Sequence, residues 1–321
     1  MKEYIKLIED RIAAFNFGDQ PVELYEPIRY ILSLGGKRLR PVFTLMACEL
    51  VDDQYEKAVF PALAVEVFHN FTLLHDDIMD NAPIRRGMKT VHEKWNPNIA
   101  ILSGDVMLIR AYDLFLKTDD VDIKAILTKF NKCASEVCEG QQYDMNFESR
   151  ATVSEAEYLN MIKLKTATLL GFAIELGAVI GGANESICRQ LYEFGINIGL
   201  GFQLKDDLLD AYADTEKFGK QIGGDIISNK KTYLLIKALE LANEQTKTNL
   251  KYWLQKKEFN PEEKVKAVLE IYDKLGIKQL SEAKINTYFD QGLKILDSIN
   301  VDMRKKEPIK ELTLKLINRE K

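Results

Sequence analysis

Two clusters of aspartates are the residues of this 321-residue sequence that are best suited to chemistry. Both close a strongly apolar stretch and share one spacing; they comprise Asp76, Asp77 and Asp80 and, later in the chain, Asp206, Asp207 and Asp210. On a helix, the first and last aspartate of each cluster lie one turn apart on the same face, where their like charges repel each other. Because a bound cation removes this repulsion, each cluster predicts a metal site.

Magnesium is the metal that these ligands favour. Hard carboxylate oxygens suit Mg²⁺, which keeps several waters and usually bridges one or two carboxylates to the phosphates of a substrate. A single cluster is more often a solvated acidic helix end. Two copies, each followed by basic residues, favour clusters that face each other across a cavity and hold divalent ions for a phosphate-bearing substrate.

Basic residues near the first cluster are placed to bind such a phosphate. A glycine pair at 35–36 precedes Lys37 and Arg40, which lie three residues apart on a predicted helix and can converge on one anion. Arg85 and Arg86 follow the first cluster after a turn, and arginine suits bidentate phosphate recognition. A surface arginine pair is usually solvated, but its place beside the acidic cluster favours a functional role.

A glycine-rich segment, residues 218–225, follows the second cluster and predicts a mobile lid. A lid over a charged ligand would explain why glycines occur there together with Lys220 and Lys230. Lys165 and Thr166 lie within an apolar helical segment. Taken alone, they indicate a snorkelling lysine and a threonine bonded to its own helix.

The composition is that of an ordinary soluble globular protein. Hydrophobic residues make up 46% and charged residues 29%, and the net charge of -5 argues against a general nucleic-acid binder. The N-terminus lacks the pattern of a secretory signal, and no uninterrupted apolar run is long enough to predict a transmembrane segment. Cysteines without paired spacing predict reduced core thiols in a cytoplasmic protein; they are Cys48, Cys133, Cys138 and Cys188.

The chain as a whole predicts an all-α fold. No proline occurs between Pro97 and Pro261, and Leu, Ala, Glu, Lys and Ile recur there at three- and four-residue spacing, as in consecutive helices. We expect roughly ten or more helices of ordinary length. Residues 233–321 have the pattern of amphipathic helices with lysine-rich faces, which predicts a solvated outer layer.

Local signals predict two helix starts and one close packing contact. Ser103 is expected to cap a helix, and Thr152 and Glu155 have the spacing of a capping box. Gly195, Gly199 and Gly201 lie in the apolar run before the second cluster. Glycine is costly inside a helix, so we expect another backbone to pack closely there.

Together these motifs resemble those of the trans-isoprenyl diphosphate synthases, the head-to-tail polyprenyl synthases that include farnesyl and geranylgeranyl diphosphate synthases. The match runs from Gly35 to Thr232 in the family's order of motifs, whereas both tails match only in helical character. The resemblance implies a single domain over residues 1–321, a bundle of long helices around a deep cavity (the isoprenoid synthase fold), and a homodimer.

The resemblance also implies an Mg²⁺-dependent condensation of isopentenyl diphosphate with dimethylallyl, geranyl or farnesyl diphosphate. Three Mg²⁺ ions are expected with substrate bound. Asp76, Asp80 and Asp206 resemble their ligands. The remaining aspartates, which would support the ions or bind them through water, are Asp77, Asp207 and Asp210, the last also a candidate metal ligand.

The other polar residues divide between two diphosphate pockets by the same resemblance. The residues expected around the allylic diphosphate are Arg85, Lys165, Gln203 and Lys220, with Lys230 reaching it through the lid. The residues expected around isopentenyl diphosphate are Lys37, Arg40, His69 and Arg86. The Lys165 carbonyl, the Thr166 hydroxyl and the Gln203 amide oxygen are suited to stabilise an allylic carbocation by their dipoles.

Product length is expected to depend on two residues before the first cluster. In the family, the positions of Phe71 and Thr72 limit chain growth, and they lie roughly 6–8 Å along the helix from Asp76. A large Phe71 beside a small Thr72 favours a C20 product, with C15 next, and disfavours C30 or longer. The first cluster also lacks the insertion seen in many bacterial farnesyl synthases, which agrees with C20.

Three other functions were weighed against this one. A terpene cyclase would share the fold and one aspartate cluster, but it has no need of Lys37, Arg40 and Arg86. A non-catalytic subunit of a heteromeric synthase would be a binding protein, and such subunits typically lose one cluster, whereas both are intact here. A purely structural helical protein explains none of these charges.

Overall fold

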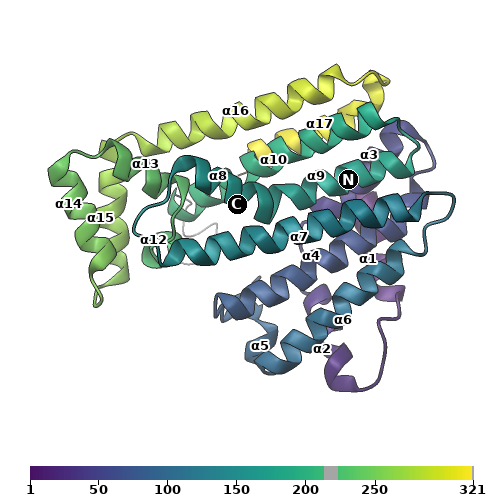
Figure 1. Cartoon of the computed structure of the whole chain (residues 1–321), viewed down its shortest axis with the longest axis horizontal. Coiled ribbons are helices and arrows are strands. Elements are labelled where there is room, and N and C mark those ends of the chain that lie inside the picture. Colours follow the sequence, from purple (N-terminus) through teal and green to yellow (C-terminus); the bar gives the residue numbers. More distant parts are fainter. Residues whose placement is uncertain (213–222, 320–321) are drawn as a thin grey trace. The chain divides into compact units, whose positions relative to one another are not determined.

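The computed structural model describes residues 1–212 and 223–319. It divides into two compact units, each assembled from separate stretches of the chain. Unit 1 comprises residues 1–133, 169–192 and 296–312, and unit 2 comprises residues 134–168, 193–295 and 313–321. The single domain expected over 1–321 stays a prediction. The structure is 78% helical with almost no strand among the described residues (Figure 1), so the predicted all-α class is confirmed.

Unit 1 is built around α4 (Val59–Met79), which packs along α6 (Pro97–Phe115) (Figure 1). Its other elements are α1 (Lys2–Ala14), α2 (Val22–Ser33), α3 (Leu39–Val51), the 3₁₀ turn η1 (Tyr55–Ala58), β1 (Ile84–Arg85), β2 (Met88–Lys89), α5 (Val91–Lys94) and α9 (Thr168–Ile180), with the start of α7 (Ile123–Glu148) and most of α17 (Met303–Ile317). Aromatic rings fill the core beside α4. The Phe130 ring lies 5.0 Å from Phe68 and 4.8 Å from Phe115.

Helix α4 and the turn before it, Tyr55–Met79, form the one described helix long and apolar enough to cross a membrane. Its 18-residue apolar window is 67% buried inside the structure. An apolar helix covered in this way is what the core of a folded domain requires. The length of α4 therefore reflects its central place in unit 1.

A tight hairpin follows α4. β1 pairs antiparallel with β2, and Arg85 lies opposite Met88. The two residues between them, Arg86 and Gly87, have φ values of 54° and 77°, and positive φ at both central positions is the mark of a type I′ turn. The hairpin reverses the chain directly after the first aspartate cluster.

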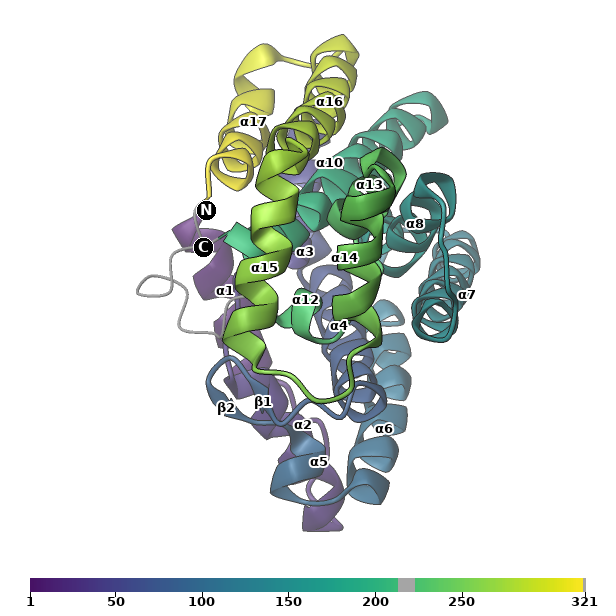
Figure 2. The ribbon, with the colours of Figure 1, turned by 90° about the vertical axis from the view of Figure 1, so that its left-hand side faces the viewer.

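Unit 2 contains the second half of α10 (Glu185–Tyr212) together with helices that precede and follow it. These are α8 (Glu155–Ile162), the π-helical turn η2 (Lys163–Ala167), α12 (Gly224–Ile227), α13 (Tyr233–Leu241), α14 (Glu244–Gln255), α15 (Pro261–Lys274) and α16 (Ile277–Ser298). The short α12 packs against α15 (Figure 2). This places the segment after the second cluster against a later helix.

Two glycines allow neighbouring helices to approach η2. A Cβ atom on Gly140 of α7 would lie 2.2 Å from the backbone N of Lys165, and one on Gly199 of α10 would lie 2.6 Å from the Cα of Ala167. Both separations are shorter than any side chain tolerates. The prediction that a backbone packs closely is confirmed at Gly199 and wrong at Gly201, where a Cβ would meet the ring of Phe289 at 2.9 Å.

Both predicted helix starts are wrong in position. Asn96 caps α6, with its Oδ1 accepting from the Ile99 N–H at 2.9 Å, whereas Ser103 is buried inside that helix and donates to the Leu24 carbonyl. The capping box of α8 uses Ser154 and Glu157. In each case the sequence offers more than one residue with a capping side chain, and tertiary packing decides which residue caps the helix.

Two expectations about exposure also need correction. Cys138 lies exposed on α7, whereas the other three cysteines are buried, and all four are free. The predicted solvated layer over 233–321 contains two buried lysines, Lys264 at 0% and Lys306 at 5% exposure. A lysine-rich pattern therefore does not mean that every lysine of these helices faces water.

Candidate functional site

The first aspartate cluster ends α4 in unit 1. Asp80 is exposed and Asp76 half-buried, while Asp77 is only 2% exposed. Helix geometry explains this difference, because Asp76 and Asp80 share a face and Asp77 lies about 100° round the axis. The Asp80 N–H donates to the Asp76 carbonyl at 2.9 Å, so the helix ends within the cluster. Two of the three carboxylates are thus accessible to a ligand.

The β1–β2 hairpin returns Arg85 to this cluster. Its Nε donates to both carboxylate oxygens of Asp77, at 2.9 and 2.8 Å, and its Nη2 donates to Oδ1 at 2.7 Å. The same Nη2 lies 3.9 Å from Oδ2 of Asp76. Burial raises the pKa of Asp77, and the hydrogen bonds from Arg85 oppose that rise. Arg85 therefore anchors Asp77; its contact with an allylic diphosphate stays a prediction.

The residues predicted for the second diphosphate pocket lie in unit 1, and two of them are in direct contact. Nη1 of Arg40 lies 3.1 Å from Nε2 of His69. Because a guanidinium only donates, His69 accepts at Nε2 and carries its proton on Nδ1. Burial lowers the pKa of His69 well below the usual 6.5, and the charges of Arg40 and Arg86 lower it further. His69 is therefore a neutral acceptor beside a guanidinium.

The glycine pair at 35–36 allows Arg86 to lie against the backbone. Gly36 has a φ of +142°, and a Cβ atom there would lie 2.7 Å from Nη2 of Arg86. Lys37, the next residue, is exposed. Arg86 thus lies beside the residue that precedes Lys37, and their shared role in a diphosphate pocket stays a prediction.

Arg38 and Glu66 form a buried ion pair that the sequence interpretation missed. Nη1 of Arg38 lies 2.6 Å from Oε1 of Glu66, and the two side chains are 2% and 3% exposed. Arg38 has a left-handed φ of 48° and precedes α3, and its Nη2 donates to the Leu32 carbonyl at 2.7 Å. The pair fixes the start of α3, between Lys37 and Arg40. The sequence signal for this ion pair is a single glutamate, Glu66, within an otherwise apolar stretch of α4.

The predicted chain-length residues sit one turn before the first cluster. The Phe71 ring lies 4.7 Å from the ring of His75 and 5.6 Å from that of Phe68. The Thr72 hydroxyl donates to the His69 carbonyl at 2.8 Å. Phe71 is therefore held by aromatic neighbours on α4, and its effect on product length stays a prediction.

The second aspartate cluster, in unit 2, repeats the arrangement of the first. Asp207 is 6% exposed; it accepts hydrogen bonds from the Tyr158 hydroxyl and, at 3.0 Å, from Nε2 of Gln203. Burial raises the pKa of Asp207 to about 7, and the charge of Asp225 adds to the rise. Asp206 keeps 40% of its side chain exposed and Asp210 is half-buried. In both clusters the second aspartate is held from inside, and the other two are more accessible.

The π-helical turn η2 presents two predicted residues to this part of unit 2. The Thr166 hydroxyl donates to Oε1 of Gln203 at 3.0 Å, and Nζ of Lys165 lies 2.7 Å from Oδ2 of Asp144. Nζ of Lys230 lies 3.9 Å from the same oxygen. Single-turn π-helices often occur at functional sites. One cavity of unit 2 is lined by all of these side chains together with Tyr158 and Asp207.

Three residues of unit 2 belong to this group although they were not predicted as site residues: Asp144, Tyr158 and Asp225. Oδ2 of Asp210 accepts from the Asp225 N–H at 2.9 Å, and burial raises the pKa of Asp225 to about 6. Arg319 forms an ion pair with Asp206 and lies 4.1 Å from the Phe202 ring centroid. The predicted lid residue Lys220 belongs to residues 213–222, outside the described part of the chain.

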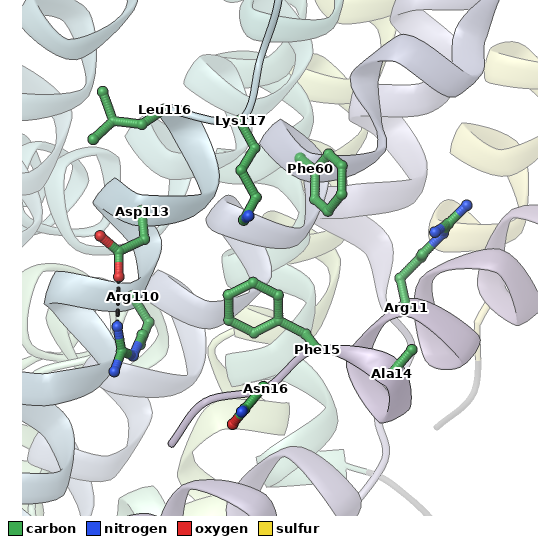
Figure 3. A pocket seen from close by; sticks show the side chains of 9 residues that line it. All are labelled: Arg11, Ala14, Phe15, Asn16, Phe60, Arg110, Asp113, Leu116 and Lys117. Atoms are coloured by element: carbon green, nitrogen blue, oxygen red, sulfur yellow. Dashed lines mark hydrogen bonds and ion pairs between the residues drawn. The ribbon is translucent and has the colours of Figure 1, made fainter.

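A separate surface cavity of about 660 Å³ lies elsewhere in unit 1 (Figure 3). Its walls come from the end of α1, the start of α4 at Phe60 and the end of α6, and Arg110 is paired there with Asp113 at 2.7 Å. Phe60 precedes Asp76 by sixteen residues, or about 24 Å along the helix. None of the predicted site residues lines this cavity.

The donor set fits Mg²⁺ that is shared with a ligand. Within residues 1–212 and 223–319, no group of three or more His, Cys, Asp or Glu side chains could hold a metal by itself. Mg²⁺ needs no such cage, because it keeps waters and completes its shell with substrate phosphates. The two accessible carboxylates of each cluster suit this mode of binding.

Comparison with known proteins identifies the family. The polyprenyl synthetase family model matches residues 21–272. The chain belongs to this family. A geranylgeranyl pyrophosphate synthase of Geoglobus acetivorans is 43% identical to this polyprenyl synthetase over 242 residues, which cover 75% of this chain and 76% of that protein. A geranylfarnesyl diphosphate synthase of Natronomonas pharaonis is 37% identical over 237 residues, or 68% and 70% of the two chains.

A solved structure agrees over nearly the whole length of this polyprenyl synthetase. The crystal structure of a geranylgeranyl pyrophosphate synthetase from Pyrococcus horikoshii has a TM-score of 0.92 and 32% identity, and the match covers 99% of this chain and 97% of that one. The resemblance noted in the sequence and the isoprenoid synthase fold that it implied are confirmed.

Proposed function

We infer that this polyprenyl synthetase is a prenyltransferase, which condenses isopentenyl diphosphate with an allylic diphosphate and releases pyrophosphate. The family match and the relatives named geranylgeranyl diphosphate synthases confirm the sequence prediction of this enzyme class. The observation that carries the conclusion is the arrangement shared by the two aspartate clusters. In each, the second aspartate is buried and held by internal donors, while the first and last are more accessible.

We propose that the accessible aspartates bind Mg²⁺ together with diphosphate oxygens. Asp76 and Asp80 would hold metal in one cluster, and Asp206 and Asp210 in the other, with three ions when substrate is bound. Bound Mg²⁺ supplies Lewis-acid charge that stabilises the departing diphosphate. The buried second aspartates would keep the metal-binding carboxylates in place, since supporting residues of this kind commonly orient metal ligands.

Residues of unit 2 are proposed to bind the allylic substrate and stabilise its cation. Lys165 is oriented by Asp144 at 2.7 Å, so its charge is in place before the diphosphate binds. The hydrogen bond from Thr166 to Gln203 orients the amide, whose oxygen and the hydroxyl supply fixed dipoles. Such preorganised dipoles stabilise developing charge at low reorganisation cost. Arg85, Lys220 and Lys230 would add positive charge around the same diphosphate.

Residues of unit 1 are proposed to bind isopentenyl diphosphate. Lys37, Arg40 and Arg86 supply cations, and His69 orients Arg40 through its neutral Nε2 atom. Holding both substrates in register converts a bimolecular encounter into an oriented reaction. The isopentenyl double bond then attacks the allylic carbon, and the departing diphosphate accepts the proton that is lost.

We propose a C20 product, with C15 as the next candidate. Phe71 supports this length, because its ring is fixed by His75 and Phe68 and would limit the space for a growing chain. The relatives named geranylgeranyl diphosphate synthases agree with C20. The Natronomonas pharaonis relative, named for geranylfarnesyl diphosphate, is less similar.

We also propose a homodimer in the cytoplasm. Leu102, Ile109 and Leu116 recur every seven residues on and just beyond α6 and are 58%, 57% and 62% exposed. An exposed apolar stripe at this spacing is suited to pack against the same stripe of a second copy. Free cysteines fit a reducing compartment.

Sizing the product tests the reaction and its chain length together. Purified protein is incubated with Mg²⁺, isopentenyl diphosphate and, separately, the C5, C10 and C15 allylic diphosphates, and the dephosphorylated alcohols are sized by chromatography. We expect C20 alcohol from all three starters. Cyclic hydrocarbon from an allylic diphosphate alone would indicate a terpene cyclase, and no release of pyrophosphate from any mixture would indicate a non-catalytic subunit.

A further inference from the structure

Lys264 is a fully buried lysine at a position that does not favour a cation. It lies in the first turn of α15, which Asn260 caps, and it is 0% exposed. The N-terminal end of a helix carries partial positive charge, so a lysine there is disfavoured. Burying an ammonium group also costs free energy unless hydrogen bonds compensate it. A residue kept at such a cost needs a specific use.

The hydrogen bonds of Lys264 lead to the turn after α12, and its Nζ also lies 4.2 Å from the centroid of the Phe259 ring. Its Nζ donates to the Ile227 carbonyl at 3.0 Å and to Oδ1 of Asn229 at 2.7 Å. The amide nitrogen of Asn229 donates in turn to the Leu254 carbonyl at the end of α14, at 3.1 Å. Lys264 therefore fastens this turn to α15, and Asn229 connects it to the end of α14 (Figure 2).

The turn of Ile227–Asn229, held by Lys264, fixes the backbone direction at Lys230. Asn229 has a left-handed φ of 59°, so the chain reverses there. The Lys230 N–H then donates to the Asp225 carbonyl, and the Thr232 N–H donates to the Lys230 carbonyl, both at 2.9 Å. With its backbone fixed in this way, Lys230 places its Nζ 3.9 Å from Oδ2 of Asp144.

Lys264 and Lys230 also line one cavity of unit 2 together with Asp207 and Asp225. A lysine that only filled space would be replaceable by an apolar side chain of similar length. The two neutral acceptors at Nζ argue against that role, because each of them would lose its hydrogen bond in the exchange. Both acceptors belong to the turn that ends at Lys230.

We propose that Lys264 is a positioning residue, which fixes the turn of Ile227–Asn229 so that Lys230 points toward Asp144 and the allylic diphosphate. The proposal rests on the proposed function, in which Lys230 binds that diphosphate. It assigns to α15 a part in substrate binding through the hydrogen bonds at Ile227 and Asn229.

Steady-state kinetics of Lys264→Met test the proposal. The variant keeps most of the stem and loses both hydrogen bonds. We expect the KM for the allylic diphosphate to rise about tenfold, which corresponds to the loss of one well-placed charge contact, while the KM for isopentenyl diphosphate stays unchanged. Lys266→Met is the matched control, because Lys266 is exposed on the same helix; its two KM values should equal those of the wild type.

Asn229 provides a second, independent pair of variants. Asn229→Gly keeps the left-handed backbone and removes the side-chain amide, which accepts from Lys264 and donates to the Leu254 carbonyl, whereas Asn229→Asp keeps the acceptor and loses the donor. We expect Asn229→Gly to raise the allylic KM at least as far as Lys264→Met does, and Asn229→Asp to raise it less because the acceptor for Lys264 remains. The double variant Lys264→Met/Asn229→Gly should raise the allylic KM by less than the product of the two single effects, because both changes remove the contact between Lys264 and Asn229. If Lys264→Met does not fold, the allylic KM of Asn229→Gly tests whether the turn held by Lys264 controls binding of the allylic diphosphate.

Hydrogen exchange gives a readout that does not depend on turnover. In Lys264→Met the backbone amides of Lys230 and Thr232 should exchange faster than in the wild type, with α8 unchanged. A purely structural lysine would lower thermal stability and leave the ratio of the two KM values unchanged, which would overturn the proposal. If the wild-type protein makes no prenyl diphosphate, the proposed function fails, and unchanged exchange at Lys230 would separately overturn the role of Lys264.

Discussion

The second aspartate of each cluster is held in place by hydrogen-bond donors, and these donors differ between the two clusters. Asp77 is held by Arg85, whereas Asp207 is held by Tyr158 and Gln203. The spacing of the aspartates was predictable, because helix geometry alone separates the middle carboxylate from the outer two. The partner Tyr158 was not, since a tyrosine within an apolar helix carries no local sign of the distant residue that it contacts.

The role of Phe71 in product length can be tested by truncation. Phe71→Ala removes the ring that contacts His75 and Phe68, and we expect a product at least one isoprene unit longer, since the growing chain gains space at that position. The measurement is chromatography of the dephosphorylated alcohols.

Phe60→Ala is the matched control for Phe71→Ala. Phe60 lies on the same helix, about 16 Å from Phe71, and lines the separate cavity of Figure 3. The control should leave product length unchanged. If Phe71→Ala also gives the wild-type length, Phe71 does not form the floor of the product cavity.

The neutral state of His69 predicts a pH dependence of stability. Burial lowers the pKa of His69 well below 6.5 in the folded protein, so the unfolded chain takes up this proton at higher pH than the folded chain does. The contribution of His69 is therefore complete above about pH 6.5 and declines as the pH falls below it. We expect His69→Gln, which keeps a neutral acceptor for Arg40, to remove this part of the decline.

Urea unfolding of wild type and His69→Gln at about pH 7.5 and pH 5.5 measures the effect. The loss of unfolding free energy between the two pH values should be smaller in the variant. Equal losses in both proteins would mean that His69 is already protonated in the folded state, contrary to its hydrogen bond from Arg40.

At the scale of secondary-structure elements, the π-helical turn η2 depends on the two helices that pack against it. Gly140 and Gly199 provide the space for the backbone of Lys165 and Ala167. The sequence predicted close packing at Gly199, but the π-helical geometry was not predictable, because its neighbours lie 25 and 34 residues from Lys165 along the chain. Only the folded arrangement brings them to Lys165 and Thr166.

Gly199→Ala should disturb this turn and lower kcat. The added Cβ would lie 2.6 Å from the Cα of Ala167, so we expect a loss of about 1–3 kcal/mol in unfolding free energy and displacement of Thr166 from Gln203. Urea unfolding and steady-state kinetics measure the two effects.

Gly201→Ala separates stability from chemistry in this test. Its Cβ would meet the ring of Phe289 at 2.9 Å and not η2. We expect Gly201→Ala to lose stability while keeping kcat. A similar fall of kcat in both variants would show that overall stability, and not the geometry of η2, controls turnover.

Sequence patterns predicted the helices, but they did not predict the exact helix boundaries or the burial of single lysines. Helix α6 begins at Pro97 with Asn96 as its cap, and not after Ser103, because proline suits the first helical position. Lys264 belongs to a lysine-rich helix, yet it is buried. Amphipathic periodicity predicts which side of a helix faces the core. It does not predict which residues at the border of the polar side are covered by other helices, because that depends on tertiary packing.

At the scale of the whole molecule, the apolar stripe on α6 predicts the oligomeric state. Leu102→Glu/Ile109→Glu places two carboxylates on the stripe, and burying them against a second copy would cost several kcal/mol. We expect light scattering coupled to size-exclusion chromatography to give the dimer mass for the wild type and the monomer mass for the double variant.

Leu314→Glu is the control for nonspecific effects of a new charge, because Leu314 is a 40% exposed leucine outside the stripe. It should remain dimeric. A monomeric wild type, or a double variant that keeps the dimer mass, would contradict the homodimer proposed here.

The family and the all-α class were predictable from the sequence because the aspartate clusters and basic motifs keep a fixed order over much of the chain. For Arg319 the sequence left two possibilities open, a reach back over a phosphate site and a frayed chain end. Its partner Asp206 lies more than a hundred positions earlier. No periodic pattern connects two such distant residues.

The ion pair between Arg319 and Asp206 has a practical consequence for anyone who purifies this protein. A polyhistidine tag fused after Lys321 would begin three residues after Arg319, whose guanidinium pairs with the candidate metal ligand Asp206. Imidazoles tethered there would compete for divalent ions and crowd the carboxylate.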